Sequence, residues 1–295
     1  MTLGTGDLVL CSGTLPRATS FGDRLAAASA AGFDGISLWG RDYAAARRDG
    51  LSDPDITAMI HDHGLAVGEL DPAWWWLPGA AEVAASIPAA YDEQEIFGFG
   101  EEELFRIGET VGARSVNAVD VFGGAWDLDD AANAFAGLCD RAAEHGLVVH
   151  LEFLPWSRIP DLEMAWYVVR TAGRHNGGVA VDAWHFTRSA SRLETLRQIP
   201  GDRILGVQLD DGPADAEDDL ITATLHDRLL PGAGGMDVTG LVSVLTEIGA
   251  AAPMGVEVFS DALHALGPAE AARLAGDAAR SIITARPGSR SGPGR

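Results

Sequence analysis

Four apolar stretches in the second half of the chain each carry one carboxylate or amide side chain near the downstream end. These residues are Glu152, Asp182, Gln208 and Glu257, in the stretches 147–155, 178–186, 204–211 and 254–260. Such a group is costly to bury in a strand without a partner, so four of them indicate a partner that they share. Converging oxygen ligands suit a hard divalent cation, and the pattern therefore predicts one Mn²⁺ or Mg²⁺ per chain. The alternative is that each residue caps a helix or pairs with an arginine.

Two further side chains are placed to act beside these four. His185 follows Asp182 by three residues, so at a strand end that curls into a loop it would face the same pocket. Arg228 precedes the glycine-rich segment 231–235, and a tight loop there would bring its guanidinium over the pocket. The alternatives are a structural histidine and a surface arginine.

The elements that must position these residues alternate between strand and helix. Strands are expected at 8–14, 35–39, 65–70, 115–122, 147–155, 178–186, 204–211 and 254–260, and helices at 20–31, 53–64, 101–111, 127–145, 161–174, 191–198, 239–248 and 268–284. Eight such units predict a single (β/α)8 barrel over residues 1–285, with its active site at the C-terminal mouth of the strands. A doubly wound open sheet is the alternative, but its Gly-x-Gly-x-x-Gly turn is absent after the first strand. Residues 71–100 and 212–237 are expected to be irregular connections, and 286–295 a disordered tail.

Tryptophans gather in the connection after the third strand, at Trp74, Trp75 and Trp76. They predict an apolar wall over the mouth for a substrate with a hydrophobic part, to which Trp184 would contribute from the sixth strand end. The alternative for the three consecutive tryptophans is that they pack a lid onto the barrel.

Composition narrows the class of partner. The chain has 295 residues and a net charge of −22, which opposes binding to nucleic acid and to anionic membranes. The N-terminal sequence lacks the features of a signal peptide and no stretch is apolar for long enough to span a bilayer, so a cytoplasmic protein that binds a small molecule is expected. Cys11 and Cys139 are expected to be buried thiols, and a homo-oligomer is compatible with the sequence.

The ordered set of polar residues resembles that of the xylose-isomerase-like (β/α)8 superfamily, which includes ketohexose 3-epimerases, inosose dehydratase, hydroxypyruvate isomerase and endonuclease IV. The resemblance rests on Glu152, on Asp182 and His185 as Asp-x-x-His, on Glu257, and on Arg228 followed by Pro-Gly-x-Gly at 231–234. It implies a metal held by Glu152, Asp182, Gln208 and Glu257, with His185 and Arg228 binding substrate oxygens. Two positions depart from the epimerases: Gln208 replaces their usual histidine, and Arg158 lies where they often carry an acid.

These observations predict a metal-dependent isomerase or epimerase, or a lyase, that acts on a small sugar-like or cyclitol-like carbonyl-hydroxy compound. One of Glu152 and Glu257 would remove the proton beside the carbonyl to give an enediolate, and the other would return a proton, with His185 as a third catalytic residue. Loss of a leaving group β to the carbonyl would make the enzyme a lyase. The alternative from another class is a non-catalytic barrel that serves as a binding or partner subunit.

Overall fold

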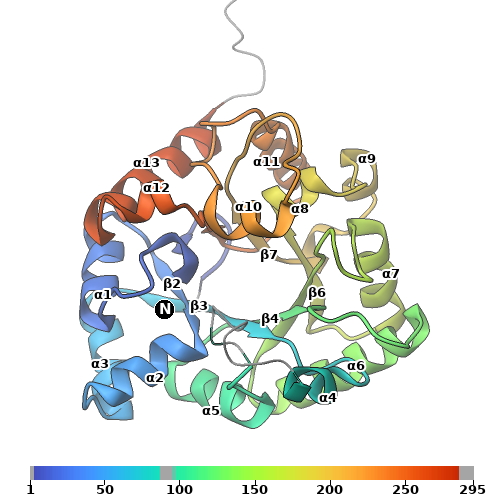
Figure 1. Cartoon of the computed structure of the whole chain (residues 1–295), viewed down its shortest axis with the longest axis horizontal. Coiled ribbons are helices and arrows are strands. Elements are labelled where there is room, and N and C mark those ends of the chain that lie inside the picture. The colour runs from blue at the N-terminus through green and yellow to red at the C-terminus, as the bar shows by residue number, and fades with distance from the viewer. Residues whose placement is uncertain (1–2, 87–94, 96, 286–295) are drawn as a thin grey trace, which may run out of the picture.

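The computed structural model of the chain describes residues 3–86, 95 and 97–285 (Figure 1). The tail 286–295, for which the sequence predicts disorder, lies outside the described residues. Within the described part, none of the helices is both long enough and apolar enough to cross a membrane.

Eight parallel strands close into a barrel in the order in which they occur in the sequence. The strands are β1 (Leu8–Leu10), β2 (Gly35–Trp39), β3 (Ala66–Ala73), β4 (Ser115–Val119), β5 (Val148–Glu152), β6 (Gly177–Asp182), β7 (Ile204–Leu209) and β8 (Met254–Val256). The first and last strands pair in parallel, which closes the ring. The prediction of a (β/α)8 barrel is therefore confirmed, and the open sheet is excluded.

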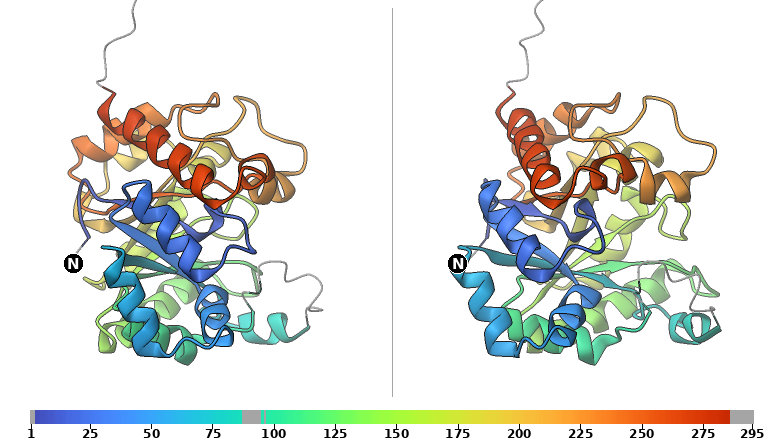
Figure 2. Two further views of the ribbon diagram at one scale, coloured as in Figure 1. Left: turned by 90° about the vertical axis from the view of Figure 1, so that its left-hand side faces the viewer. Right: turned by 60° about the vertical axis from the view of Figure 1, so that its left-hand side comes forward.

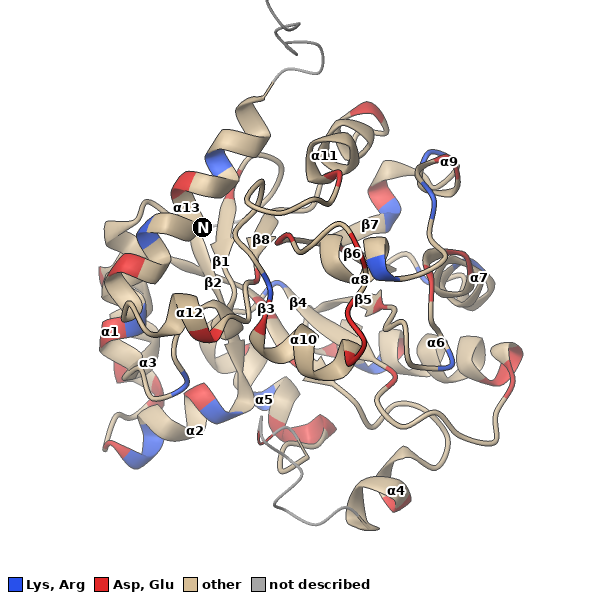
Figure 3. Cartoon of the chain, turned by 45° about the horizontal axis from the view of Figure 1, so that its top comes forward, with Lys and Arg blue, Asp and Glu red and all other residues tan. Residues whose placement is uncertain are grey.

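Helices form the outer layer around this barrel (Figures 1, 2 and 3). They are α1 (Phe21–Ala30), α2 (Gly40–Arg48), α3 (Asp53–Asp62), α4 (Ala80–Ser86), α5 (Glu101–Val111), α6 (Leu128–Glu144), α7 (Leu162–Ala172), α8 (Ala183–Arg188), α9 (Leu193–Leu196), α10 (Leu220–His226), α11 (Val238–Glu247), α12 (Asp261–His264) and α13 (Pro268–Thr284). Helices α1 and α13 pack side by side, so the first and last units also meet in the outer layer.

The alternation of side chains along each strand separates the hydrophobic core from a polar barrel interior. In β5, Val149 and Leu151 belong to the main hydrophobic core, which also includes Phe135 of α6. His150 and Glu152 therefore point to the opposite side, into the barrel. Cys11 and Cys139 are buried, as expected, and both are free thiols.

Several expected boundaries were wrong. The stretch 71–100 is not wholly irregular, because β3 continues to Ala73 and α4 follows it. Helix α2 was missed, and α10 interrupts the connection 212–237. Strand β6 stops at Asp182 because that side chain accepts the backbone N–H of His185 and so begins α8. Strand β8 ends at Val256, one residue before Glu257.

Candidate active site

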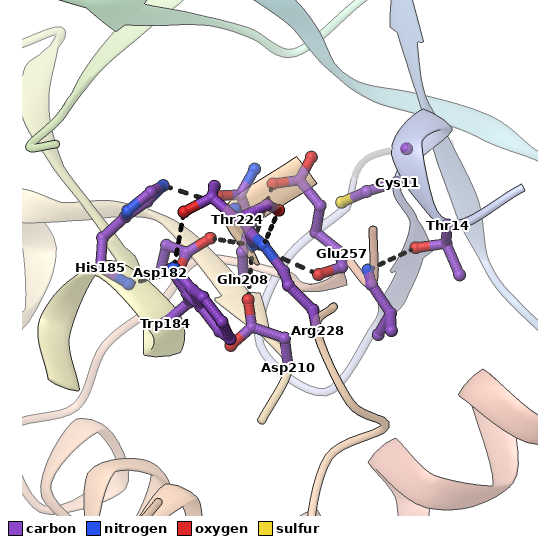
Figure 4. Close-up of polar contacts among 12 residues, drawn as sticks. Cys11, Thr14, Asp182, Trp184, His185, Gln208, Asp210, Thr224, Arg228 and Glu257 are labelled. Atoms are coloured by element: carbon purple, nitrogen blue, oxygen red, sulfur yellow. Dashed lines mark hydrogen bonds and ion pairs between the residues drawn. The ribbon is translucent and has the colours of Figure 1, made fainter. Parts of the chain in front are cut away.

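The four residues expected to share a metal lie together at the C-terminal mouth of the barrel. Glu152, Asp182 and Gln208 occupy the ends of β5, β6 and β7, and Glu257 follows β8 directly. Asp182 and Gln208 are register partners on neighbouring strands, and all four side chains are buried. Figure 4 shows Asp182, Gln208 and Glu257 directed toward a common centre. The structure thus brings together the predicted set from four consecutive strands.

Three of these side chains carry an oxygen without a hydrogen-bond partner among the described residues. The atoms are Oε1 of Glu152, Oε1 of Gln208 and Oε1 of Glu257. A buried polar atom without a partner is costly, and a bound cation is one way to satisfy such oxygens. Glu152, Asp182 and His185 also offer ligand atoms that all lie within 4.8 Å of one another. The residues present therefore fit a divalent metal ion.

The electrostatics of the cluster favour the same conclusion. Burial, followed by the negative charges of Asp182 and Asp71, raises the pKa of Glu152 well above its usual value. Burial also raises the pKa of Glu257, against the lowering effect of Arg228. A metal ion would relieve this crowding of buried carboxylates and keep them ionised.

Arg228 reaches the site from the long connection after β7, as expected. Its side chain is buried there among acidic side chains. The Nη1 atom donates to Oδ2 of Asp182 at 2.8 Å and to Oδ2 of Asp210 at 2.5 Å, and it lies 3.6 Å from Oε2 of Glu257. Arg228 is therefore a buried counter-ion for three carboxylates (Figure 4). Its Nη2 lies 3.4 Å from Nε2 of His185, which leaves the guanidinium at the edge of the site.

His185 lies on the first turn of α8, not on a curling strand end. Its backbone N–H donates to Oδ1 of Asp182, which holds the ring beside the cluster. Its Nε2 lies 3.7 Å from Oε1 of Glu152. Burial lowers the pKa of His185 to about 4, so the ring is neutral near pH 7 and can accept a proton.

Residues 25–283 match the family model described as the xylose isomerase-like TIM barrel. The chain belongs to this family. Its relatives include 3-dehydroshikimate dehydratase of Pseudomonas aeruginosa, 28% identical over 87% of this chain and 38% of that protein, and the same enzyme of Pseudomonas putida, 28% identical over 93% and 40%. Inosose isomerase of Bacillus subtilis is 34% identical over 47% of this chain and 49% of its own length. This chain thus spans about two fifths of the length of the dehydratases that it matches.

Solved structures have the same fold. A crystal structure of the IolI protein with a bound zinc atom superposes with a TM-score of 0.78 at 22% identity, covering 94% of this chain and 98% of that one. The probable 3-dehydroshikimate dehydratase AsbF of Bacillus anthracis superposes with a TM-score of 0.69 at 14% identity, covering 95% and 99%. At these identities the likeness supports the barrel fold alone.

The tryptophans of this xylose isomerase-like barrel divide between the mouth and the helix layer. Trp75 packs on Phe105 of α5 and donates to Oε2 of Glu101, and Trp76 packs on Phe135 of α6. Trp76 is therefore part of the helix layer, whereas Trp75 also packs edge-on against Trp74, with ring centroids 6.1 Å apart. Trp184 is fully buried, with its ring beneath Arg228 and its Nε1 donating to Oγ1 of Thr224 at 2.8 Å, so it supports the arginine and does not face the mouth.

Trp74 is the member of the group that remains a candidate wall of the pocket. Its ring packs with Phe97 and Phe122, and it shares a small buried cluster with Val119 and Leu154. Val119 ends β4 and Leu154 follows β5, so this cluster lies beside the mouth. It is separate from the main core, and its position suits contact with an apolar part of a substrate.

Several polar residues of the barrel interior were missed by the sequence argument. Nδ2 of Asn117 donates to Oε2 of Glu152 at 2.6 Å and to Oδ1 of Asp71 at 3.0 Å, so it orients a proposed ligand. Burial, and then the charge of Glu69, raises the pKa of Asp71 to about 8. Asp71 and Glu69 are two residues apart on β3, and this spacing on one strand face was a signal that could have revealed them. Asp210, the partner of Arg228, was missed as well.

Proposed function

We propose that the chain is a divalent-metal-dependent lyase that removes water from a small cyclic hydroxy ketone, beginning with proton removal beside the carbonyl. The observation that carries this proposal is the buried set of Glu152, Asp182, Gln208 and Glu257 at the mouth, in which one oxygen each of Glu152, Gln208 and Glu257 has no hydrogen-bond partner among the described residues. The relatives named as dehydratases align over 87% and 93% of the chain, and this favours loss of water as the outcome.

Glu152, Asp182, Gln208 and Glu257 would hold the ion. Bound there, a divalent metal supplies a Lewis acid that polarises a carbonyl and acidifies the neighbouring C–H bond. We propose Mn²⁺ or Mg²⁺, because an amide and three carboxylates are oxygen donors, which hard cations prefer. Zinc is the ion in the IolI crystal structure, so it is the competing choice.

The protein's own groups would move the protons. One of Glu152 and Glu257 would accept the proton from the carbon beside the carbonyl, since both are buried carboxylates at the mouth of the barrel. Where Glu152 is the base, His185, whose Nε2 lies 3.7 Å from Oε1 of Glu152, would receive that proton from Glu152 and pass it to the leaving hydroxyl. The carbon–oxygen bond breaks and the hydroxyl departs as water, which balances the proton removed at the start.

Isomerisation is the second candidate, and the 34% identity to inosose isomerase over half of the chain favours it. The first step would be the same. The proton would then return to a carbon atom, and no water would leave. A non-catalytic barrel remains the alternative from another class, and it need not keep the metal.

One experiment separates these functions. The Mn²⁺-loaded protein would be incubated in D₂O with 3-dehydroshikimate and, separately, with an inosose, and followed by proton NMR and ultraviolet absorbance. Loss of water from 3-dehydroshikimate, with formation of an aromatic ring, supports the lyase. Deuterium exchange or a rearranged inosose without loss of water supports the isomerase. The Glu257→Gln variant and chelator-treated protein are the controls, and no reaction of either compound contradicts both enzyme proposals for these substrates.

Metal content provides an independent test. Elemental analysis would be made on protein purified without added metal and again after reconstitution with Mn²⁺. One equivalent per chain is expected in the reconstituted sample. Absence of stoichiometric metal from both samples would exclude the proposed centre.

A further inference from the structure

Gln208 differs from the three carboxylates around it because its side chain has two unlike ends. The amide oxygen can bind a cation, but the amide nitrogen is a donor and cannot. A rotation by half a turn about the last side-chain bond would exchange the positions of the amide oxygen and the amide nitrogen. A glutamine therefore serves as a metal ligand only where something fixes the orientation of its amide.

Glu69 of β3 is in position to do this. Nε2 of Gln208 donates to Oε1 of Glu69 at 3.2 Å, and the opposite end of the amide, Oε1, is the atom without a partner among the described residues. Both side chains are at least nine-tenths buried, with Glu69 about 8% and Gln208 about 2% exposed. A carboxylate only accepts hydrogen bonds, so it stabilises the orientation with the nitrogen toward itself and repels the other.

Glu69 is itself held in place from several sides. Its Oε2 lies 3.3 Å from Nε2 of His150, which also contacts Oγ of Ser115 at 3.2 Å. The thiol of Cys11 lies 3.6 Å from Oε1 of Glu69. Burial alone would raise the pKa of Glu69, but hydrogen bonds from His150, Gln208 and Cys11 hold it below its usual value. These contacts fix the carboxylate oxygen that faces the amide of Gln208.

Two glycines leave room for this buried layer. A Cβ atom at Gly206 would lie 2.4 Å from Nδ1 of His150, so a side chain there would displace the imidazole that supports Glu69. A Cβ atom at Gly255 would lie 2.8 Å from Sγ of Cys11 and 3.4 Å from Cγ of Gln208. The backbone of β7 and β8 thus accommodates the side chains that surround the Glu69–Gln208 contact.

We propose that Glu69 is a positioning residue that fixes the amide of Gln208 with its oxygen toward the metal ligands and so determines how tightly the site holds its metal. The inference rests on the proposed metal-dependent function. Groups behind a ligand that orient it through a hydrogen bond commonly contribute about 10–100-fold to metal affinity.

The test uses the full chain and measures Mn²⁺ binding by isothermal titration calorimetry. Three variants are needed: Glu69→Gln, Gln208→Glu, and the swap that combines both changes. In Glu69→Gln the new amide can accept from Gln208 or donate to it, so the orientation is no longer dictated. Mn²⁺ affinity is expected to fall about 10–100-fold.

The swap has the same formal charge as the wild type, but the carboxylate now lies at position 208. A carboxylate presents an oxygen in either orientation, so it needs no orienting group. Glu69→Gln is therefore expected to strengthen Mn²⁺ binding when it is made in the Gln208→Glu background, because it removes the repulsion between two buried carboxylates. A merely structural role for Glu69 would weaken binding in both backgrounds.

Glu101→Gln, remote from the site and paired with Arg141, is the control and is expected to bind Mn²⁺ as the wild type does. Normal binding by the wild type with unchanged affinity in Glu69→Gln would overturn this inference and leave the proposed function standing. Weaker binding after Glu69→Gln in both backgrounds would also overturn it. Absence of Mn²⁺ binding by the wild type would overturn the metal centre itself. If Glu69→Gln does not fold, comparison of the swap with Gln208→Glu still shows whether the change at position 69 strengthens or weakens Mn²⁺ binding.

Discussion

Replacing Arg228 with methionine should destabilise the metal-free protein strongly. The guanidinium is buried and faces the carboxylates of Asp182, Asp210 and Glu257 at 2.8, 2.5 and 3.6 Å. Methionine keeps most of the length of the side chain but removes the positive charge. The three carboxylates would then be left without their buried counter-ion, and the protein would have to protonate them or admit water.

The expected size of the effect follows from the burial of these groups. Removing one partner of a buried ion pair typically costs about 3–5 kcal/mol. The entropy of unfolding of a chain of 295 residues is about 0.6 kcal/mol per kelvin, since each residue contributes roughly 2.1 cal/mol per kelvin. The melting temperature should therefore fall by about 5–8 °C. Saturating Mn²⁺ should recover part of this loss, because a ligand at 100 times its Kd stabilises the folded state by about 2.7 kcal/mol.

Urea unfolding and differential scanning calorimetry, each with chelator and with Mn²⁺, would measure these changes. Arg273→Met is the matched control, because Arg273 pairs with Glu270 and Asp277 on the exposed face of α13 and should contribute little. An unchanged melting temperature of chelated Arg228→Met would refute the assignment of Arg228 as the counter-ion of the cluster. A loss of stability that Mn²⁺ does not reduce at all would refute the link between this cluster and the metal.

Four further predictions concern the site and the class of ligand. Glu152→Gln and Glu257→Gln should each abolish turnover, and metal analysis of each variant should separate loss of the ion from loss of the base; near-normal turnover in either would contradict the assignment. Trp74→Ala should raise KM, whereas Trp76→Ala should lower the melting temperature and leave KM unchanged because Trp76 packs on Phe135 of α6 in the main core; the reverse pattern would contradict this placement. The pKa of His185 is about 4 in the folded protein and about 6.5 in an unfolded chain, so between these pH values the unfolded chain binds one more proton. The stability of the folded protein should therefore decline as pH falls from about 6.5 to 4, and it should decline less in His185→Phe. Equal pH dependence of the two proteins would count against this prediction. Duplex DNA with an abasic site should not bind at physiological salt, because the net charge is −22; binding that strengthens at low salt would disprove this.

The strand ends were predictable because a polar residue in an apolar run is visible in the sequence. Glu152, Asp182 and Gln208 each lie at the end of such a run, and the alternation of side chains turns them toward the barrel axis. Asp71 was placed in the irregular connection 71–100, although β3 continues through it to Ala73. The predicted strand 65–70 was therefore too short to include Asp71, the second of its two interior acids.

The burial of Arg228 among three carboxylates was not predictable, since it depends on the path of a long connection. Asp211 fixes that path by accepting the backbone N–H groups of Gly212, Gly232 and Met236, and it pairs with Leu229. These contacts lie up to 25 residues apart in the sequence and leave no periodic pattern. Helix α2 was missed for a related reason: it has few apolar residues, and Asp42 stabilises its first turn and pairs with the buried Arg24.

The contact between Gln208 and Glu69 joins residues that are 139 positions apart. All four proposed ligands come from the half of the barrel that contains β5 to β8, whereas Glu69 and Asn117, which orient two of them, come from β3 and β4. A fragment that begins after β4 would contain every ligand and lack both of these orienting groups. We therefore expect tight metal binding only from the assembled halves, and complementation of two separately expressed half-barrels could be followed by the return of Mn²⁺ affinity.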